Sequence, residues 1–113
     1  MSLNQALENL IKDELKAKTF ASGSKGFHAT GKIVGDDGAR YQAQAQAVLI
    51  GSKDNPKVKV KATPQEAIAA LAGVADSLAP KRFRTGRTGY YATGKTEIAG
   101  QRFQVQAQAV QLT

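Results

Sequence analysis

The sequence predicts an α+β fold in which two helices pack on one face of a curved antiparallel sheet. Two observations predict it. First, the chain contains one stretch twice: Phe20–Lys32 shares seven of thirteen positions with the stretch that begins at Phe83, and Arg40–Val48 shares seven of nine with the stretch that begins at Arg102. Second, a segment with helical periodicity precedes each copy. We therefore expect an internally duplicated helix–hairpin unit.

The length limits how the two units can be organised. The chain has 113 residues, and half of that length would bury little surface alone. We expect a single domain, residues 1–113, made of two repeats at about 2–62 and 63–113. Duplicated halves usually meet about a twofold axis, so we expect a pseudo-twofold arrangement with one continuous sheet or two facing sheets.

The first repeat is expected to begin with a helix over residues 2–16, which Ser2 can cap. Residues 19–25 are expected to be an extended or irregular connection. A hairpin of two strands is expected over residues 27–34 and 40–50, because each run is bounded by turn-forming residues. The helix prediction depends on one stripe of apolar residues at helical spacing, which are Leu3, Leu7, Leu10, Ile11 and Leu15.

A third strand is expected at Lys57–Lys61, where lysine and valine alternate strictly. The second helix should begin directly after it, with Thr63 as the N-cap, Pro64 in the first turn and Glu66 completing a capping box. Pro80 should end this helix. Its apolar stripe consists of Ile68, Leu71, Ala72, Ala75 and Leu78.

The chain closes with a second hairpin. Residues 81–87 are expected to form a basic connecting segment, equivalent in position to residues 19–24 of the first half. Strands are expected over residues 89–98 and 101–112, joined by a tight turn at Ala99 and Gly100.

Alternation along the strands gives the predicted sheet two different faces. One face carries mainly alanine, glycine and aromatic residues, so we expect the helices to cover it. The other face carries lysine, arginine, threonine and glutamine, with an aromatic ring at the matching place in each half, His28 and Tyr91. Glu97 is the main acidic residue expected there.

This second face predicts the function. The net charge of +7 and the pI near 9.9 favour an anionic partner. Lysine and arginine can hold phosphates, glutamine can hydrogen-bond to bases, and aromatic rings can stack on them. We expect non-catalytic binding of single-stranded nucleic acid, DNA before RNA. The residues expected to bind are Lys25, His28, Lys32, Arg40, Lys57, Lys59, Lys61, Arg84, Arg87, Tyr91, Lys95 and Arg102.

One stretch matches a nucleotide-binding motif by its letters. Residues 89–96, GYYATGKT, fit the P-loop pattern G-x-x-x-x-G-K-[ST]. A P-loop requires a helix directly after it, whereas Thr96 here leads into a turn and another strand. The first half has Ile33 where the hydroxyl for Mg²⁺ belongs, so the motif is not expected to bind a nucleotide.

No residue pattern indicates catalysis, a cofactor or a metal site. His28 is the only histidine and there is no cysteine, so a zinc site is not expected. Asp36 and Asp37 are explained by a hairpin turn. The lack of cysteine and of a visible signal peptide favours a cytoplasmic location, and the longest apolar run is too short to span a bilayer, so no membrane partner is expected.

Two other functions stay open at this stage. The sheet face or an exposed edge strand could serve protein interaction or assembly into a homodimer. The repeated Thr-Gly-Lys, at residues 30–32 and 93–95, could hold a phosphate-bearing ligand. A strict monomer in solution would count against the first of these, and a lack of oligonucleotide binding at low salt would count against the nucleic-acid prediction.

The segment Gly51–Leu78, a basic loop, an alternating strand and a Pro-started helix, resembles the end of the transcriptional positive cofactor four domain. Whirly proteins fuse two such units, and the chain looks like small uncharacterised cyanobacterial proteins placed in that fold. The resemblance implies single-stranded DNA binding on the open sheet face, foremost by Lys32, Lys95, Tyr91 and Arg102. The order of elements differs, because a helix precedes the first hairpin and no strand and helix follow the second.

Overall fold

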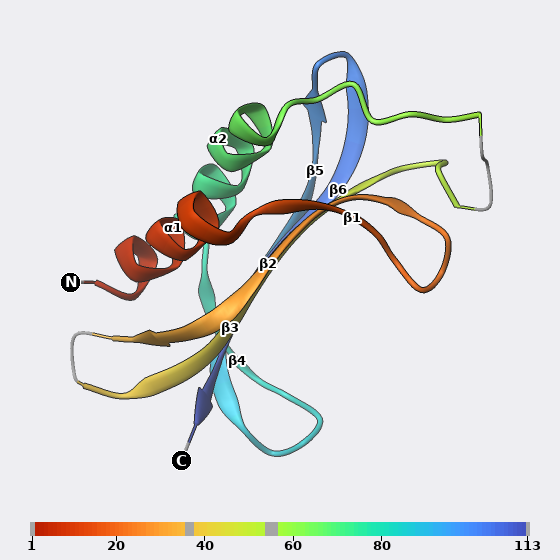
Figure 1. The fold of residues 1–113 in the computed structure, drawn as a ribbon. Helices are drawn as coiled ribbons and strands as arrows, with labels where there is room; N and C mark the ends of the chain where they lie inside the picture. The colour runs from red at the N-terminus through yellow and green to blue at the C-terminus, as the bar shows by residue number, and fades with distance from the viewer. Residues whose placement is uncertain (1, 36–37, 54–56, 113) are drawn as a thin grey trace.

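The computed structural model describes residues 2–35, 38–53 and 57–112 and contains one six-stranded sheet and two helices (Figure 1). The strand order across the sheet is β1-β2-β3-β6-β5-β4, and neighbouring strands are antiparallel. In chain order the elements are α1 (Leu3–Glu14), β1 (Lys16–Thr19), β2 (Lys25–Val34), β3 (Arg40–Leu49), α2 (Pro64–Ala75), β4 (Ala79–Arg82), β5 (Thr88–Ile98) and β6 (Gln101–Leu112).

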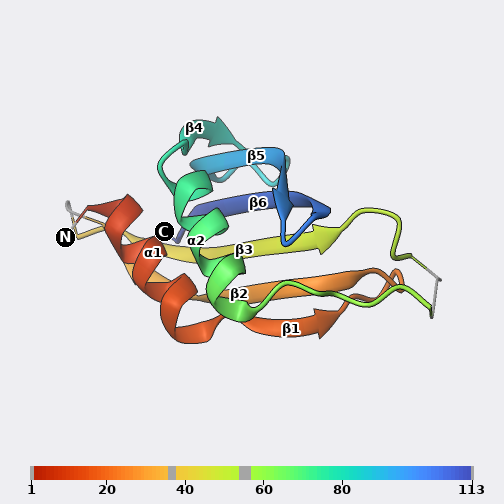
Figure 2. The same ribbon diagram turned by 90° about the horizontal axis from the view of Figure 1, so that it is seen from above.

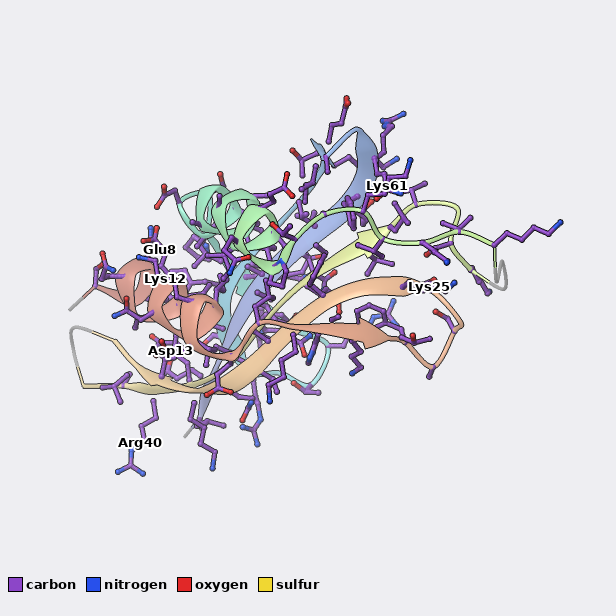
Figure 3. The ribbon with its side chains drawn as sticks, turned by 45° about the horizontal axis from the view of Figure 1, so that its top comes forward. Glu8, Lys12, Asp13, Lys25, Arg40 and Lys61 are labelled. Carbon is purple, nitrogen blue, oxygen red and sulfur yellow. The ribbon has the colours of Figure 1, made fainter. Side chains whose placement is uncertain are left out.

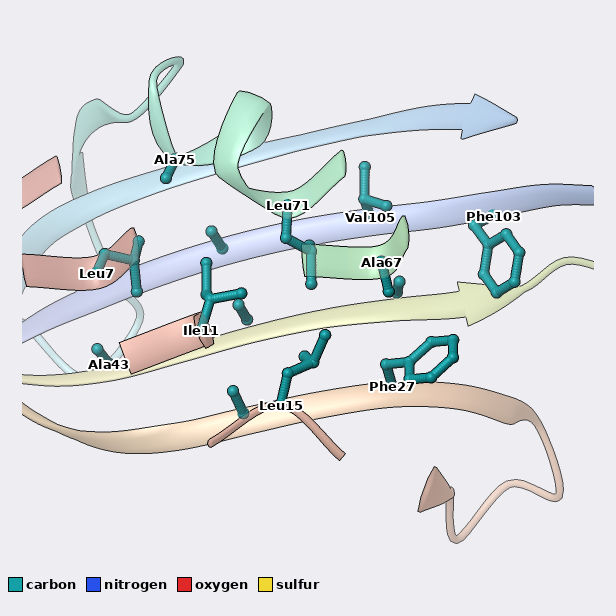
Figure 4. Packing of buried hydrophobic residues seen from close by; sticks show 14 of the residues in the cluster. Leu7, Ile11, Leu15, Phe27, Ala43, Ala67, Leu71, Ala75, Phe103 and Val105 are labelled. Atoms are coloured by element: carbon teal, nitrogen blue, oxygen red, sulfur yellow. The ribbon is translucent and has the colours of Figure 1, made fainter. Parts of the chain in front are cut away.

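Both helices lie on one face of the sheet, next to each other (Figures 1 and 2). Helix α1 packs mainly on β2, and α2 packs on β3, β5 and β6. Apolar side chains from both helices meet side chains from the four central strands in one buried cluster (Figure 4). The labelled members of this cluster are Leu7, Ile11, Leu15, Phe27, Ala43, Ala67, Leu71, Ala75, Phe103 and Val105. The α+β prediction is confirmed, as one continuous antiparallel sheet.

The helix starts are the ones that the sequence predicts. The Ser2 hydroxyl accepts a hydrogen bond of 3.1 Å from the Gln5 N–H. At the second helix, the Thr63 hydroxyl accepts from the Glu66 N–H at 3.2 Å, and the Glu66 carboxylate accepts from the Thr63 N–H at 3.0 Å. These bonds satisfy backbone donors that the first helical turn leaves without partners. Helix α1 ends at Glu14, two residues earlier than expected, because Leu15 is extended.

Small residues let the helices approach the sheet. Ala43, Ala45 and Ala47 of β3 have no exposed surface. Gly31 lies under α1, since a Cβ atom there would stand 2.8 Å from a methyl group of Leu10. Gly94, the matching glycine of the second half, has open space around the same position. A helix therefore approaches the sheet closely at Gly31 and not at Gly94.

The predicted strand at Lys57–Lys61 is wrong, because these residues form no ladder with a neighbouring strand. The predicted alternation is present, since Val58 and Val60 pack against the buried cluster while the lysines are exposed. Side-chain hydrogen bonds replace a ladder. The Gln101 amide donates to the Lys59 carbonyl at 2.9 Å and accepts from the Lys61 N–H at 2.8 Å.

The structure has two short edge strands that the sequence did not predict, β1 where the first helix was expected to end and β4 around Pro80. Strand β1 pairs with β2, and β4 pairs with β5. The turn between β1 and β2 and the turn between β4 and β5 have the same hydrogen-bond pattern. Phe20 and Phe83 donate their N–H groups to the carbonyls of Ser24 and Arg87, while their own carbonyls accept from a glycine three residues on, Gly23 or Gly86. Both glycines have positive φ, 90° and 86°, as a three-residue loop with a bulge requires.

The P-loop match lies inside strand β5, which runs without a break from Thr88 to Ile98. No helix begins there, as the sequence predicts. The Ala99–Gly100 turn is confirmed, with φ values of 53° and 78°. The expected turn position of Asp36 and Asp37 lies outside the described residues.

Candidate nucleic-acid interface

The face of the sheet opposite the helices is the candidate site, and we call it the open face. Register and alternation assign its side chains. Figure 3 shows one of them, Arg40, pointing away from α1, on which Glu8, Lys12 and Asp13 lie. Its polar residues are Lys16, Lys18, His28, Thr30, Lys32, Arg40, Gln42, Gln44, Gln46, Lys81, Tyr91, Thr93, Lys95, Glu97, Arg102, Gln104, Gln106 and Gln108.

The described acidic residues are unevenly distributed between the two sides of the molecule, whereas lysines lie on both sides. Most of the described acidic residues belong to the helices: Glu8, Asp13 and Glu14 to α1, Glu66 to the first turn of α2, and Asp76 to its C-cap. Glu97 is the described acidic residue that lies in the sheet, and it stands opposite Arg102. The open face is therefore almost uniformly cationic, which attracts anionic ligands and orients them as they approach.

One corner of the open face, at the start of β2, gathers two cations and two rings. We call Lys16, Lys18, Phe20 and His28 the β1–β2 corner. The Lys18 ammonium lies 5.3 Å from the centre of the Phe20 ring. The Phe20 and His28 rings meet edge to face, with their centres 6.2 Å apart. Lys16 stands directly opposite His28 in the ladder, on the same face.

The diagonally opposite corner, at the start of β5, has a matching group. We call Lys81, Phe83 and Tyr91 the β4–β5 corner. The Lys81 ammonium lies 4.1 Å from the Tyr91 ring centre and 5.4 Å from that of Phe83. The pairs Lys18 and Lys81, Phe20 and Phe83, and His28 and Tyr91 all have the same separation along the chain. A cation over an aromatic face is a stable arrangement at an exposed site.

His28 is half-buried and hydrogen-bonds with the Gln44 side chain. Burial lowers the pKa of the imidazole below its ordinary value of 6.5, and the positive charge of Lys18 lowers that pKa further. The hydrogen bond to Gln44 opposes both effects. Burial and the charge of Lys18 therefore favour the neutral imidazole in the free protein, which can act as an aromatic surface and a hydrogen-bonding group.

Some of the polar groups between the corners hold the sheet together. The Gln42 amide donates to the Thr30 hydroxyl and the Gly31 carbonyl, both at 3.2 Å. The Gln104 amide donates in the same way to Thr93, at 3.0 Å, and to the carbonyl of Gly94, at 2.9 Å. These amides are engaged within the sheet. Three other glutamines of β3 and β6 are the better candidates for contact with a ligand, and these are Gln46, Gln106 and Gln108.

The register connects each corner with a lysine of the other half of the chain. One row of opposed residues runs Lys18, Gly26, Val48, Gln104 and Lys95. The other row runs Lys81, Gly89, Val110, Gln42 and Lys32. Because neighbouring strands lie about 4.8 Å apart, each row spans roughly 19 Å. A lysine stands at both ends of each row.

Four of the residues expected to bind lie on the helix side. The Lys25 ammonium donates to the Val58 carbonyl at 2.7 Å, so this side chain points toward the segment that follows β3. Lys57, Lys59 and Lys61 belong to that segment, which packs over the buried cluster on the helix side of the sheet (Figure 2). The prediction that these lysines extend the basic face is wrong, because it required a third strand.

The other expected residues surround the open face. Lys32 and Arg40 line a cavity of about 430 Å³ with Leu112. Arg84 and Arg87 are exposed in the turn that carries Phe83. Arg102 is exposed but stands opposite Glu97, which offsets its charge. His28, Tyr91 and Lys95 lie on the face, as expected.

Sequence reasoning missed Phe20 and Phe83 as site residues. It identified Lys16, Lys18 and Lys81 only as basic residues that flank each hairpin, and did not include them among the residues expected to bind. Edge strands β1 and β4 place them beside His28 and Tyr91, and neither strand was expected. The signal that could have found them is the duplication itself, since a lysine and a phenylalanine precede the ring at His28 and the ring at Tyr91 by the same intervals.

Among the described residues, no group of three or more His, Cys, Asp or Glu side chains is arranged to hold a metal ion. In the same part of the chain, neither helix has the length and apolar character needed to cross a membrane. Comparison with known proteins adds no relative: no family model, no curated protein and no solved structure matches the chain.

Proposed function

We propose that the open face binds single-stranded nucleic acid without catalysis and with little sequence preference, single-stranded DNA being the first partner to test. The observation that carries the proposal is the pair of lysine–aromatic corners on the open face. Most of the described acidic residues lie on the other side of the molecule. Aromatic rings stack on any base, and lysines neutralise phosphates regardless of sequence. The chemistry of the face therefore suits a flexible strand with exposed bases.

The proposal includes an internal duplication with a pseudo-twofold axis. The β3–β6 register supports it. Ala45 stands opposite Ala107, which is its own counterpart in the second copy of the duplicated stretch. Gln44 stands opposite Gln108 and Gln46 opposite Gln106, so exchanging the two similar stretches converts one pair into the other. The recurring turns and corners are further support.

The resemblance to the positive cofactor four and Whirly folds stays a prediction. The stretch on which it rests, Gly51–Leu78, forms no strand at residues 57–61. The lysine–aromatic corners do not depend on that stretch, and the nucleic-acid proposal rests on them.

Protein interaction or homodimer formation is the alternative. Edge pairing is disfavoured, because β1 and β4 have four residues each and carry lysines and Pro80. Chromatography with light scattering measures the mass of the particle in solution. A homodimer that protects the open face from solvent, measured by hydrogen exchange, would favour the alternative.

A charge-matched pair of variants tests the proposal. Lys32→Ala/Lys95→Ala removes two cations from the open face, and Lys12→Ala/Lys59→Ala removes two exposed cations from the helix side. Fluorescence anisotropy with labelled oligo-dT and oligo-rU is measured at 50 and 500 mM salt. The first variant should bind more weakly at low salt. Its loss of affinity between 50 and 500 mM salt should be about 25-fold smaller than that of the unmodified chain, since each of the two phosphate contacts contributes about 0.7 to the logarithmic slope.

The control variant should bind within about twofold of the unmodified chain at 50 mM salt, apart from a small effect of net charge. Equal losses in both variants would indicate general electrostatic attraction and would contradict a site on the open face. Lack of binding by the unmodified chain at 50 mM salt would end the proposal.

A further inference from the structure

The two corners differ at two positions, although their lysine and phenylalanine are the same. Where the β1–β2 corner has Lys16 and His28, the β4–β5 corner has Ala79 and Tyr91. The pairing is equivalent, because Lys16 stands opposite His28 and Ala79 stands opposite Tyr91. The first corner thus has a second ammonium and an imidazole, and the second corner has a methyl group and a phenol ring.

The β1–β2 corner also has a cavity. It has a volume of about 250 Å³ and is lined by Lys16, Lys18, His28, Thr30 and Glu14, together with the small residues Ala17 and Ala29. Two lysines and a histidine line this hollow, so their side chains can offer a phosphate group several charge-assisted hydrogen bonds. Glu14, at the end of α1, is the carboxylate that borders this cavity.

The β4–β5 corner is arranged for a ring instead. The Lys81 ammonium stands 4.1 Å from the Tyr91 ring centre and 5.4 Å from that of Phe83, so the lysine already contacts the rings. Ala79 beside them is small and exposed, which leaves room next to the Tyr91 ring. A base can stack there, where the side chains offer a flat surface and one cation.

We infer that the two corners have different tasks: the β1–β2 corner binds a backbone phosphate and the β4–β5 corner stacks a base. This inference rests on the proposed function. It makes the binding face asymmetric, because a bound strand is held by its backbone at one corner and by a base at the other. Protonation of His28 adds a third positive charge beside the phosphate. Affinity at this corner therefore rises as the pH falls.

The groups that face His28 decide the sign of this pH effect. Lys18 of β1 repels the imidazolium in the free protein, and Lys16 stands opposite His28 in the ladder. Gln44 of β3 hydrogen-bonds with the ring, and Glu14 of α1 borders the same cavity. The negative charge of a phosphate dianion or diester in the cavity attracts the imidazolium and favours the protonated form of His28. Binding should therefore raise the pKa of His28, which lies below 6.5 in the free protein.

Exchanging the differing residues between the two corners tests the inference. Lys16→Ala/His28→Tyr gives the first corner the residues of the second, and Ala79→Lys/Tyr91→His does the reverse. Each residue introduced already occupies the equivalent position in the other half. Binding of oligo-dT is measured at pH 7.5 and 5.5 and at 50 and 500 mM salt, because thymine does not titrate in this range. Circular dichroism and thermal unfolding confirm that both variants are folded.

The first variant should lose the gain in affinity between pH 7.5 and 5.5, and its loss of affinity over the tenfold salt range should be about fivefold smaller at pH 7.5. The reverse variant should gain both properties, with a salt dependence about fivefold larger. It should also lose the quenching of a fluorescent base analogue that stacks on Tyr91, whereas the first variant keeps it.

Inorganic phosphate provides a probe without a base or a sugar. Adding it to the unmodified chain should shift the imidazole resonances of His28, and the shift should be absent in Lys16→Ala/Lys18→Ala. If the unmodified chain binds oligo-dT but the exchanged residues move neither the salt dependence nor the pH dependence, the inference is wrong and the proposed function stands. If no strand binds at all, the proposed function and this inference fall together.

Discussion

At the scale of single residues, two glycines lie where the paired strands of each hairpin approach too closely for a side chain. Gly26 and Gly89 stand at equivalent places in β2 and β5, and a Cβ atom at either would overlap a backbone carbonyl, that of Ala47 or Ala109. A backbone group cannot turn away as the end of a side chain can. Only glycine therefore fits these positions, in contrast with Gly94, which has open space around it.

Gly89→Ala should lower the free energy of unfolding by about 2 kcal/mol or more, because the strands must separate to admit a methyl group. Gly94→Ala in the same strand should raise it by up to about 0.5 kcal/mol, since alanine restricts the unfolded chain more than glycine does. Urea denaturation monitored by circular dichroism measures both values. Equal effects of the two substitutions would contradict the close approach at Gly89.

At the scale of elements, the start of α2 is set by local hydrogen bonds. Thr63→Ala removes the hydroxyl that accepts from the Glu66 N–H and should lower the free energy of unfolding by about 1 kcal/mol. Thr63→Ser keeps an equivalent hydroxyl and should stay close to the unmodified chain. Thermal denaturation of the three proteins tests this, and a Thr63→Ala protein as stable as Thr63→Ser would show that the cap contributes nothing.

The elements that sequence predicts correctly have a periodic pattern or a local signal. The leucines of α1 repeat at helical spacing, and the alanines and glutamines of β3 alternate, so these elements are predictable. Strands β1 and β4 have neither signal, because all four residues of each are exposed and each pairs on one side only. Their pairing depends on the turns at Phe20 and Phe83, which position them against β2 and β5.

The wrong strand at Lys57–Lys61 has a different physical reason. Alternation reports that one side of a segment is buried, and Val58 and Val60 are indeed packed against the core. Alternation does not report whether a strand edge is free. Strand β3 is paired on both sides, with β2 and β6, so the segment that follows it has no adjacent edge. It crosses the helix side of the sheet instead, held by Gln101.

At the scale of the whole molecule, the sheet separates two chemical surfaces. The helices carry most of the described acids, and the open face carries lysine, arginine and the two lysine–aromatic corners. Strand alternation was sufficient to place His28, Lys32, Tyr91 and Lys95 on this face. It could not predict the remaining corner residues, because the edge strands β1 and β4 carry no periodic signal.

The central claim is that a single strand binds the open face and leaves the helix side free. It is tested most directly by a ¹H–¹⁵N correlation spectrum of the full chain, titrated with short oligo-dT at 50 mM salt. Shifts should concentrate in β1, β2, β4 and β5 near Phe20, His28, Phe83 and Tyr91, and the amides of α1 and of residues 57–61 should stay in place. Shifts confined to the helix side, or a spectrum that does not change at millimolar oligonucleotide, would contradict the claim.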